Sequence, residues 1–115
     1  LITDAMRAAG KGEGMFPFGD REVIVKDGVA WLSDFETFAG SVATPEVCIR
    51  TVVQKAGIPL VDAIKMMTLT PARICGLCST KGSIAQGKDA DIILFDENIN
   101  ILSVFKKGKR VFQTQ

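Results

Sequence analysis

The alternation of apolar and polar positions predicts β-structure in the first third of the chain. Residues 1–3 form a short apolar and β-branched run that predicts a buried strand, and Asp4 falls at its end. Residues 7–20 contain four glycines and a proline and predict a loop. Apolar runs on both sides of an Asp-Gly pair at 27–28 predict a β-hairpin over about residues 22–32, because this pair readily adopts the positive φ angles of a two-residue turn.

Helical spacing dominates the middle of the chain, after a second predicted loop over residues 33–43. A Thr-Pro-Glu sequence opens a helix over residues 44–56, since it offers a capping hydroxyl, a proline in the first turn and an acid near the positive end of the helix dipole. A second helix is predicted over residues 60–69. A third opens at Thr70-Pro71 and ends at Gly76.

The last part of the chain returns to β-structure. Residues 92–95 are all apolar and predict a buried strand, and residues 101–112 predict a second hairpin that turns at Lys107-Gly108. The order of elements is therefore strand, hairpin, three helices and a β-rich end.

Composition narrows the possible partners. The 115 residues are 47% hydrophobic and 23% charged with a net charge of +1, which is ordinary for a globular domain and speaks against nucleic acid or an anionic membrane surface. No apolar run approaches the roughly 20 residues that span a membrane. Three cysteines and no visible export signal favour a reducing compartment, and a cytoplasmic location is predicted.

The cysteines and the absence of histidine limit the available chemistry. Cys75 and Cys78 could form a redox pair or half of a zinc site, or be one buried small residue and one loop residue. A zinc site needs about four ligands, and only Cys48 remains besides the pair. Without histidine, the chain cannot itself contain Ser-His or Cys-His catalysis.

Two other segments are candidates for a site. Asp4 is either a cap or turn residue or, as in parallel α/β barrels, a catalytic group at the carboxyl end of a strand, where a carboxylate can relay a proton. Residues 38–41 are either a turn that leads into the first helix or a loop that faces a ligand. Residue type alone leaves both alternatives open.

Five motifs in a fixed order carry a resemblance to a known family. They are LITDAMRAAG, VKDGVAWL, FAGS, TLTPARICGL and KGSIAQGKDADIILFD. Together they resemble the C-terminal part of the N-acetylglucosamine-6-phosphate deacetylases, which belong to the amidohydrolase superfamily. The last motif is typical of the whole superfamily, whereas LITDAM combined with FAGS points to the deacetylases.

This resemblance implies an α/β fold that is a C-terminal fragment of a larger one. Residues 1–78 would be the end of a metal-dependent (β/α)8 TIM-like barrel, with its last strand, its closing helices and a β-hairpin. Residues 79–115 would be the returning strands of a small composite β-sandwich domain.

The resemblance also implies an activity and its residues. The family hydrolyses the acetamide of N-acetylglucosamine-6-phosphate to glucosamine-6-phosphate and acetate. Asp4 would be the catalytic acid and base, and Phe38, Ala39 and Gly40 would bind the substrate. A divalent metal, zinc or iron, serves the parent enzyme, but its Glu and His ligands and the phosphate-binding residues lie upstream, so no metal is expected on this chain. The parent is expected to be a homo-oligomer and the isolated chain to be inactive.

Other interpretations remain. The chain could belong to a different amidohydrolase, dihydroorotase-like or imidazolonepropionase-like, which a panel of substrates would distinguish. It could be a non-catalytic α+β interaction module, which would unfold in a clean two-state transition as a monomer. A redox or metal module at Cys75 and Cys78 would show a perturbed thiol pKa or a retained metal.

Overall fold

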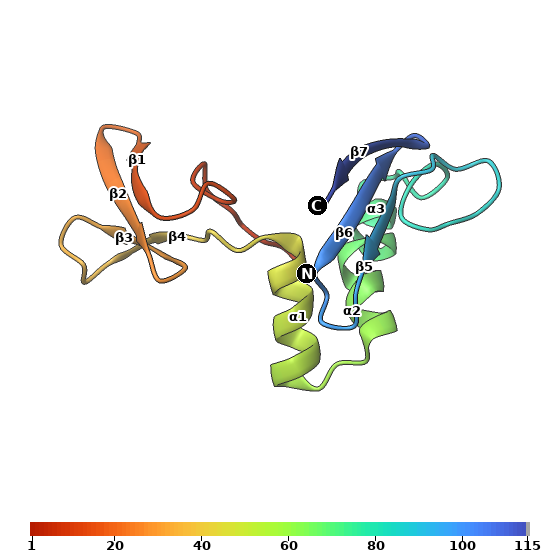
Figure 1. The fold of residues 1–115 in the computed structure, drawn as a ribbon, viewed down its shortest axis with the longest axis horizontal. Helices are drawn as coiled ribbons and strands as arrows, with labels where there is room; N and C mark the ends of the chain where they lie inside the picture. The colour runs from red at the N-terminus through yellow and green to blue at the C-terminus, as the bar shows by residue number, and fades with distance from the viewer. Residues whose placement is uncertain (115) are drawn as a thin grey trace. The chain divides into compact units, whose positions relative to one another are not determined.

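The computed structural model describes residues 1–114, and these form two compact units. One unit runs from Ile2 to Cys48, and the other contains Leu1 together with the residues from Ile49 onward. Each unit has its own cluster of buried apolar side chains. Figure 1 shows the elements along the chain, and the strands of the unit from Ile2 to Cys48 are those drawn in red and orange.

The first unit is built on a four-stranded antiparallel sheet. Its strands follow the chain order and are β1 (Gly14–Phe18), β2 (Arg21–Lys26), β3 (Val29–Leu32) and β4 (Phe38–Gly40). The hairpin predicted over 22–32 is confirmed. Asp27 and Gly28 have φ angles of 52° and 73°, as a two-residue turn with left-handed backbone requires.

The two loops predicted around this hairpin are in part strands, so those predictions were wrong. β1 lies within the predicted loop 7–20 and pairs with β2, and β4 lies within 33–43 and pairs with β3. Both are edge strands, where glycine and proline are tolerated because one side makes no ladder hydrogen bonds. Their composition therefore resembles that of a loop.

One face of this sheet forms the core of the first unit. Val23 and Val25 on β2 and Ala30 on β3 are buried, as expected for alternate residues of a strand. Ala8 from the segment before β1 completes this cluster. Partly buried apolar side chains pack around it: Met6, Phe16, Ala39 and Val42.

The buried strand predicted at residues 1–3 is absent. These residues have no regular secondary structure, and Ile2 is 81% exposed. A parallel strand is stable when strands flank it and its faces are covered. Within residues 1–114, the first segment makes only an isolated parallel bridge, between Ala5 and Ser41.

The three predicted helices are present as α1 (Pro45–Ala56), α2 (Leu60–Met67) and α3 (Leu69–Ile74). Gly57 and Gly76 follow α1 and α3 with φ angles of 68° and 70°, which confirms both predicted stops. α3 begins just before the predicted Thr70. None of the helices within residues 1–114 is long and apolar enough to cross a membrane.

A three-stranded antiparallel sheet follows the helices. Its strands are β5 (Ile92–Phe95), β6 (Ile101–Lys106) and β7 (Lys109–Gln113), so the predicted strand and the second hairpin are confirmed. The prediction that residues 92–95 are buried was wrong, because Ile93 and Leu94 are 53% and 50% exposed. β5 lies at the edge of the sheet, where fewer neighbours cover its side chains.

The core of the second unit joins the helices to this sheet. Ile49 of α1, Ala63 of α2 and Ile99 from the β5–β6 connection are buried together, with Phe95 of β5 packed against them. Arg50 holds the same connection in place through its guanidinium, which donates to the carbonyls of Asn98 and Ile99 at 2.9 Å each.

An ion cluster ties the segment after α3 to the β6–β7 turn. The Lys81 ammonium pairs with Asp89 at 2.7 Å and also with Asp91. The Asp91 carboxylate accepts a hydrogen bond from the Lys107 N–H at 2.8 Å. Lys81 and this N–H hold the pKa of Asp91 below its ordinary value of 3.8, and the two aspartates raise the pKa of Lys81 above 10.5.

Neutralising Asp91 is expected to flatten the acid dependence of stability. A carboxyl group with a lowered folded-state pKa contributes stability above its unfolded pKa of about 3.8 and loses it as the pH falls further. The free energy of unfolding of Asp91→Asn should therefore fall less than that of the wild type between about pH 5 and pH 2. Urea unfolding at each pH measures this difference.

The matched control for this experiment is Glu97→Gln. Glu97 is exposed, and its carboxylate makes no hydrogen bond or ion pair with any residue from 1 to 114. Its variant should keep the acid dependence of the wild type. Added salt should weaken the contribution of Asp91, because the pair is about one-third exposed. Equal acid sensitivity of Asp91→Asn and wild type would contradict the stabilising role.

Candidate active site

The structure brings the two candidate segments of the first unit together. Ala5, the residue after Asp4, forms a parallel bridge with Ser41, the residue after β4. The Met6 N–H donates to the Ser41 carbonyl at 2.8 Å. Asp4 and Gly40 directly precede the bridged residues, so the acid and the predicted substrate segment meet at one place.

Asp4 has a free carboxylate on a strained backbone. Its side chain is exposed, and its φ of 48° lies in the left-handed region, which aspartate tolerates better than most residues. Within the described chain the carboxylate makes no hydrogen bond or ion pair, so it caps no backbone group there. It is available to accept a proton from a water or a ligand.

The three residues of β4 differ in their exposure, their contacts and their backbone conformation. Phe38 is 70% exposed, and its ring centroid lies 4.8 Å from that of Trp31. Ala39 is partly buried against the core. Gly40 has a φ of 144°, and a Cβ built there would lie 3.6 Å from the Met6 side chain. Gly40 therefore supplies a backbone conformation that other residues rarely adopt.

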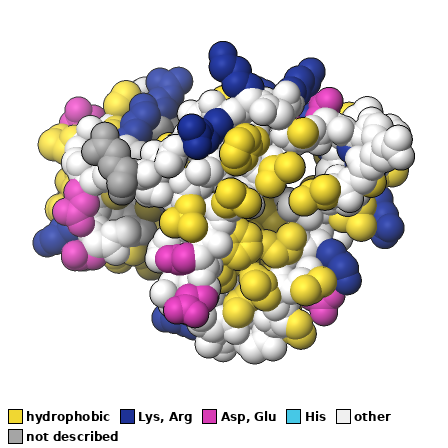
Figure 2. Space-filling view, turned by 45° about the vertical axis from the view of Figure 1, so that its right-hand side comes forward, with side chains coloured by type: hydrophobic (Ala, Val, Ile, Leu, Met, Phe, Trp, Pro, Cys, Tyr) yellow, Lys and Arg dark blue, Asp and Glu magenta, His cyan; other side chains and the backbone are white. Residues whose placement is uncertain are grey.

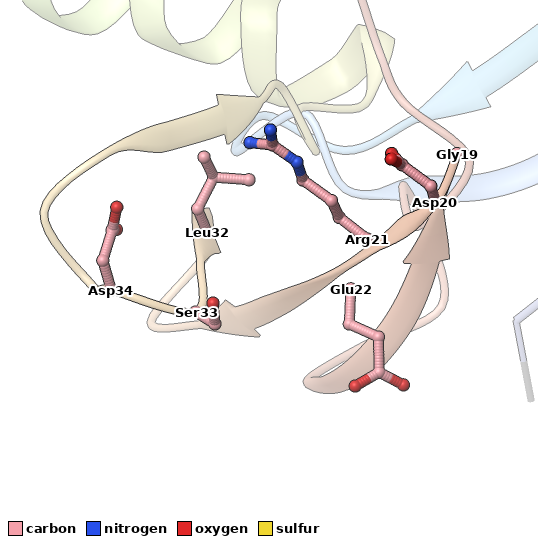
Figure 3. Close-up of a pocket in the computed structure, with 7 residues that line it drawn as sticks. All are labelled: Gly19, Asp20, Arg21, Glu22, Leu32, Ser33 and Asp34. Atoms are coloured by element: carbon pink, nitrogen blue, oxygen red, sulfur yellow. The ribbon is translucent and has the colours of Figure 1, made fainter.

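A cavity of about 560 Å³ lies elsewhere in the first unit (Figure 3). Its wall contains three carboxylates, but Figure 3 shows them spread around the edge and pointing in different directions. The Asp34 carboxylate accepts the backbone N–H groups of Glu36 and Thr37 at 2.9 and 3.0 Å, which lowers its pKa. Asp34 therefore stabilises a turn. The lining residues include no predicted site residue: Gly19, Asp20, Arg21, Glu22, Leu32, Ser33 and Asp34.

The described residues do not fit a metal centre by themselves. They contain no group of three or more His, Cys, Asp or Glu side chains that could hold a metal ion, and the sequence contains no histidine. Cys75 and Cys78 are both exposed and free, so the expectation that one of them is buried was wrong. Cys75 follows the end of α3 and does not lie at a helix N-terminus.

Two features of this site differ from what the sequence led us to expect. Residues 38–41 were predicted as a turn or loop, although Phe38–Gly40 is a strand, and the contact between Trp31 and Phe38 was not predicted. The available signal was the aromatic residues Trp31 and Phe38 on either side of a turn-forming Ser33-Asp34 pair, because aromatic residues often face each other in adjacent strands.

Similarity to known proteins shows which family this chain belongs to. The sequence model of the Amidohydrolase family matches residues 14–111, and the chain belongs to this family. The chain is 36% identical over 115 residues to the N-acetylglucosamine-6-phosphate deacetylase of Rattus norvegicus and 37% identical to that of Caenorhabditis elegans. Each alignment covers all of this chain and 28% of the relative, so the chain spans just over a quarter of their length.

Solved structures agree with the sequence relatives. The crystal structure of N-acetylglucosamine-6-phosphate deacetylase from Pasteurella multocida matches with a TM-score of 0.87 and 33% identity, over 95% of this chain and 28% of that one. A mutant of the Mycobacterium smegmatis deacetylase in complex with N-acetyl-D-glucosamine-6-phosphate matches with a TM-score of 0.80 and 35% identity, over 96% and 30%. The resemblance inferred from the five motifs is confirmed.

Proposed function

We propose that this chain is the C-terminal portion of a hydrolase that removes the acetyl group from N-acetylglucosamine-6-phosphate and yields glucosamine-6-phosphate and acetate. The observation that carries the proposal is the similarity to deacetylases along the whole chain, at 36% and 37% identity for two relatives. The Ala5–Ser41 bridge supports it, because it joins the two motifs that resemble the deacetylases most specifically.

Asp4 is the proposed acid and base. Its free carboxylate takes a proton from the attacking water and then gives it to the departing amine. Phe38, Ala39 and Gly40 are the proposed lining of the acyl and sugar pocket. The exposed ring of Phe38 and the uncovered backbone of Gly40 support this role, since both can approach a ligand closely.

Amidohydrolases are generally metal-dependent, and zinc or iron is the proposed metal of the intact enzyme. By "intact enzyme" we mean a protein of the relatives' length that contains these 115 residues. Its metal ligands and phosphate-binding residues would come from outside this chain, as the family resemblance implies. The bound metal would polarise the amide carbonyl of the substrate.

We further propose that residues 1–78 complete a (β/α)8 barrel and that residues 79–115 return to a small β-sandwich domain. Exposed apolar side chains support the presence of covering polypeptide in the intact enzyme. Ile74 and Ile84 are each 82% exposed, and Figure 2 shows hydrophobic side chains gathered on one face. We also propose that the intact enzyme is cytoplasmic, which the three free cysteines support. The family resemblance implies that it is a homo-oligomer.

Acetate release by the intact enzyme tests the activity. N-acetylglucosamine-6-phosphate is the expected substrate. N-acetylgalactosamine-6-phosphate is the second candidate, because a relative from Escherichia coli O157:H7, 32% identical over 109 residues that cover 95% of this chain and 29% of the relative, is named a deacetylase of that sugar. Dihydroorotate and imidazolonepropionate complete the panel, and turnover of one of these instead would overturn the proposal. This chain alone with added zinc should release no acetate.

A further inference from the structure

Four apolar side chains form a continuous row across the first sheet. The strand register pairs Met15 of β1 with Ile24 of β2, Ile24 with Trp31 of β3, and Trp31 with Phe38 of β4. Directly paired residues of neighbouring strands project from the same face of a sheet. The row therefore lies on the face opposite the buried core residues, which occupy the alternate positions of β2 and β3.

Exposure and ring geometry show how this row ends at Phe38. Ile24 and Trp31 are partly buried, whereas Met15 and Phe38 at the two ends are 62% and 70% exposed. The rings of Trp31 and Phe38 lie 4.8 Å apart between centroids and are tilted by 36°, within the range of favourable aromatic pairs. Trp31 thus covers the side of Phe38 that faces the sheet, and the other side stays open because β4 is an edge strand.

A β-bulge contributes to this contact. The register shifts between Ala30 and Trp31, so that Ala30 faces Gly40 while Trp31 faces Phe38, and Ala39 is the extra residue of β4. Bulges commonly redirect a neighbouring side chain. Ala39 turns toward the core while Phe38 is brought against Trp31.

The same strand leads directly to the candidate acid. After Gly40 the chain reaches Ser41, which is bridged to the residue that follows Asp4. Movement of Phe38 is therefore resisted on one side by Trp31 and, through the backbone of β4, by the bridge at Ser41. The contact with Trp31 therefore supports the orientation of Phe38. Trp31 lies outside LITDAM and FAGS, the two motifs that point to the deacetylases.

We propose that Trp31 is a positioning residue that holds Phe38 as an aromatic wall of the amino-sugar pocket. This inference rests on the proposed function. Trp31 contacts no reacting atom, so its loss should weaken binding of substrate and transition state alike. Such a change raises KM and leaves kcat nearly unaltered.

The intact enzyme with Trp31→Leu tests the inference. Leucine keeps an apolar side chain at the position but removes the ring contact, and KM for N-acetylglucosamine-6-phosphate should rise about 3- to 10-fold, the equivalent of one aromatic pair. Trp31→Phe should restore KM to nearly the wild-type value. Met15→Leu, at the far end of the same row, is the matched control and should leave KM unchanged.

A double-mutant cycle with Phe38→Leu separates positioning from general stability. If Trp31 acts through Phe38, the double variant should have nearly the same KM as Phe38→Leu alone. Unchanged KM in Trp31→Leu, a fall in kcat alone, or additive effects in the cycle would each overturn the inference. If Trp31→Leu does not fold, Trp31→Met, which also lacks a ring, takes its place in the cycle with Phe38→Leu. Absence of acetate release by the wild type would instead overturn the proposed function.

Discussion

Replacing Asp4 by asparagine in the intact enzyme is expected to lower kcat by about 10²- to 10⁴-fold, the usual contribution of a positioned general acid and base. Asparagine has the size of aspartate and tolerates the φ of 48° equally well, so the backbone should keep its conformation. What it lacks is the ability to take a proton from water and return it to the amine. KM should change little, and steady-state acetate release with N-acetylglucosamine-6-phosphate measures both constants.

Asp27→Asn is the matched control for this variant. Asp27 is also exposed and has a φ of 52°, but it lies in the β2–β3 turn and takes no part in the bridge between Ala5 and Ser41. The same chemical change there should leave kcat unaltered. An Asp4→Asn enzyme whose kcat stays within about threefold of the wild type would rule out Asp4 as the proton carrier.

Gly82→Ala is expected to cause the largest loss of stability among glycine-to-alanine substitutions in the second unit. A Cβ at Gly82 would lie 2.7 Å from the Ala72 Cβ and 3.0 Å from the Leu69 Cα, so it would collide with α3. The φ of 85° adds backbone strain for any residue with a side chain. Together these effects should lower the free energy of unfolding by about 2–4 kcal/mol, measured by urea denaturation.

Gly87→Ala separates the collision from the strain. Gly87 has a φ of 87°, but a Cβ there would meet nothing within 4 Å. The free energy of unfolding of Gly87→Ala should fall only by the cost of the backbone strain, about 1–2 kcal/mol. Equal losses for the two alanine variants would show that the close approach of residue 82 to α3 contributes nothing to stability.

Much of the secondary structure followed from short-range rules. Both hairpins turn where predicted, because Asp27-Gly28 and Lys107-Gly108 can adopt positive φ angles without help from distant residues. The helix stops at Gly57 and Gly76 follow from the same property of glycine. These elements were predictable because the residues that define them are neighbours in the chain.

The errors occurred where structure depends on pairing between separate segments. β1 and β4 have loop-like compositions and form strands only because β2 and β3 offer them hydrogen bonds. Residues 1–3 have a strand-like composition and form no strand, because the described chain places no parallel neighbour beside them. Composition alone does not report whether a pairing partner is present.

The sequence by itself determined the two hairpins, the helix stops at Gly57 and Gly76, the amidohydrolase resemblance and the choice of Asp4 as the candidate acid. Only the tertiary structure decided that the segment after Asp4 is bridged to Ser41, that Trp31 lies against Phe38 and that Gly82 packs on α3. Turns and helix ends are set by the conformational preferences of adjacent residues. Bridges, ring contacts and close approaches depend on how separate elements pair and pack, so they arise only once the chain has folded.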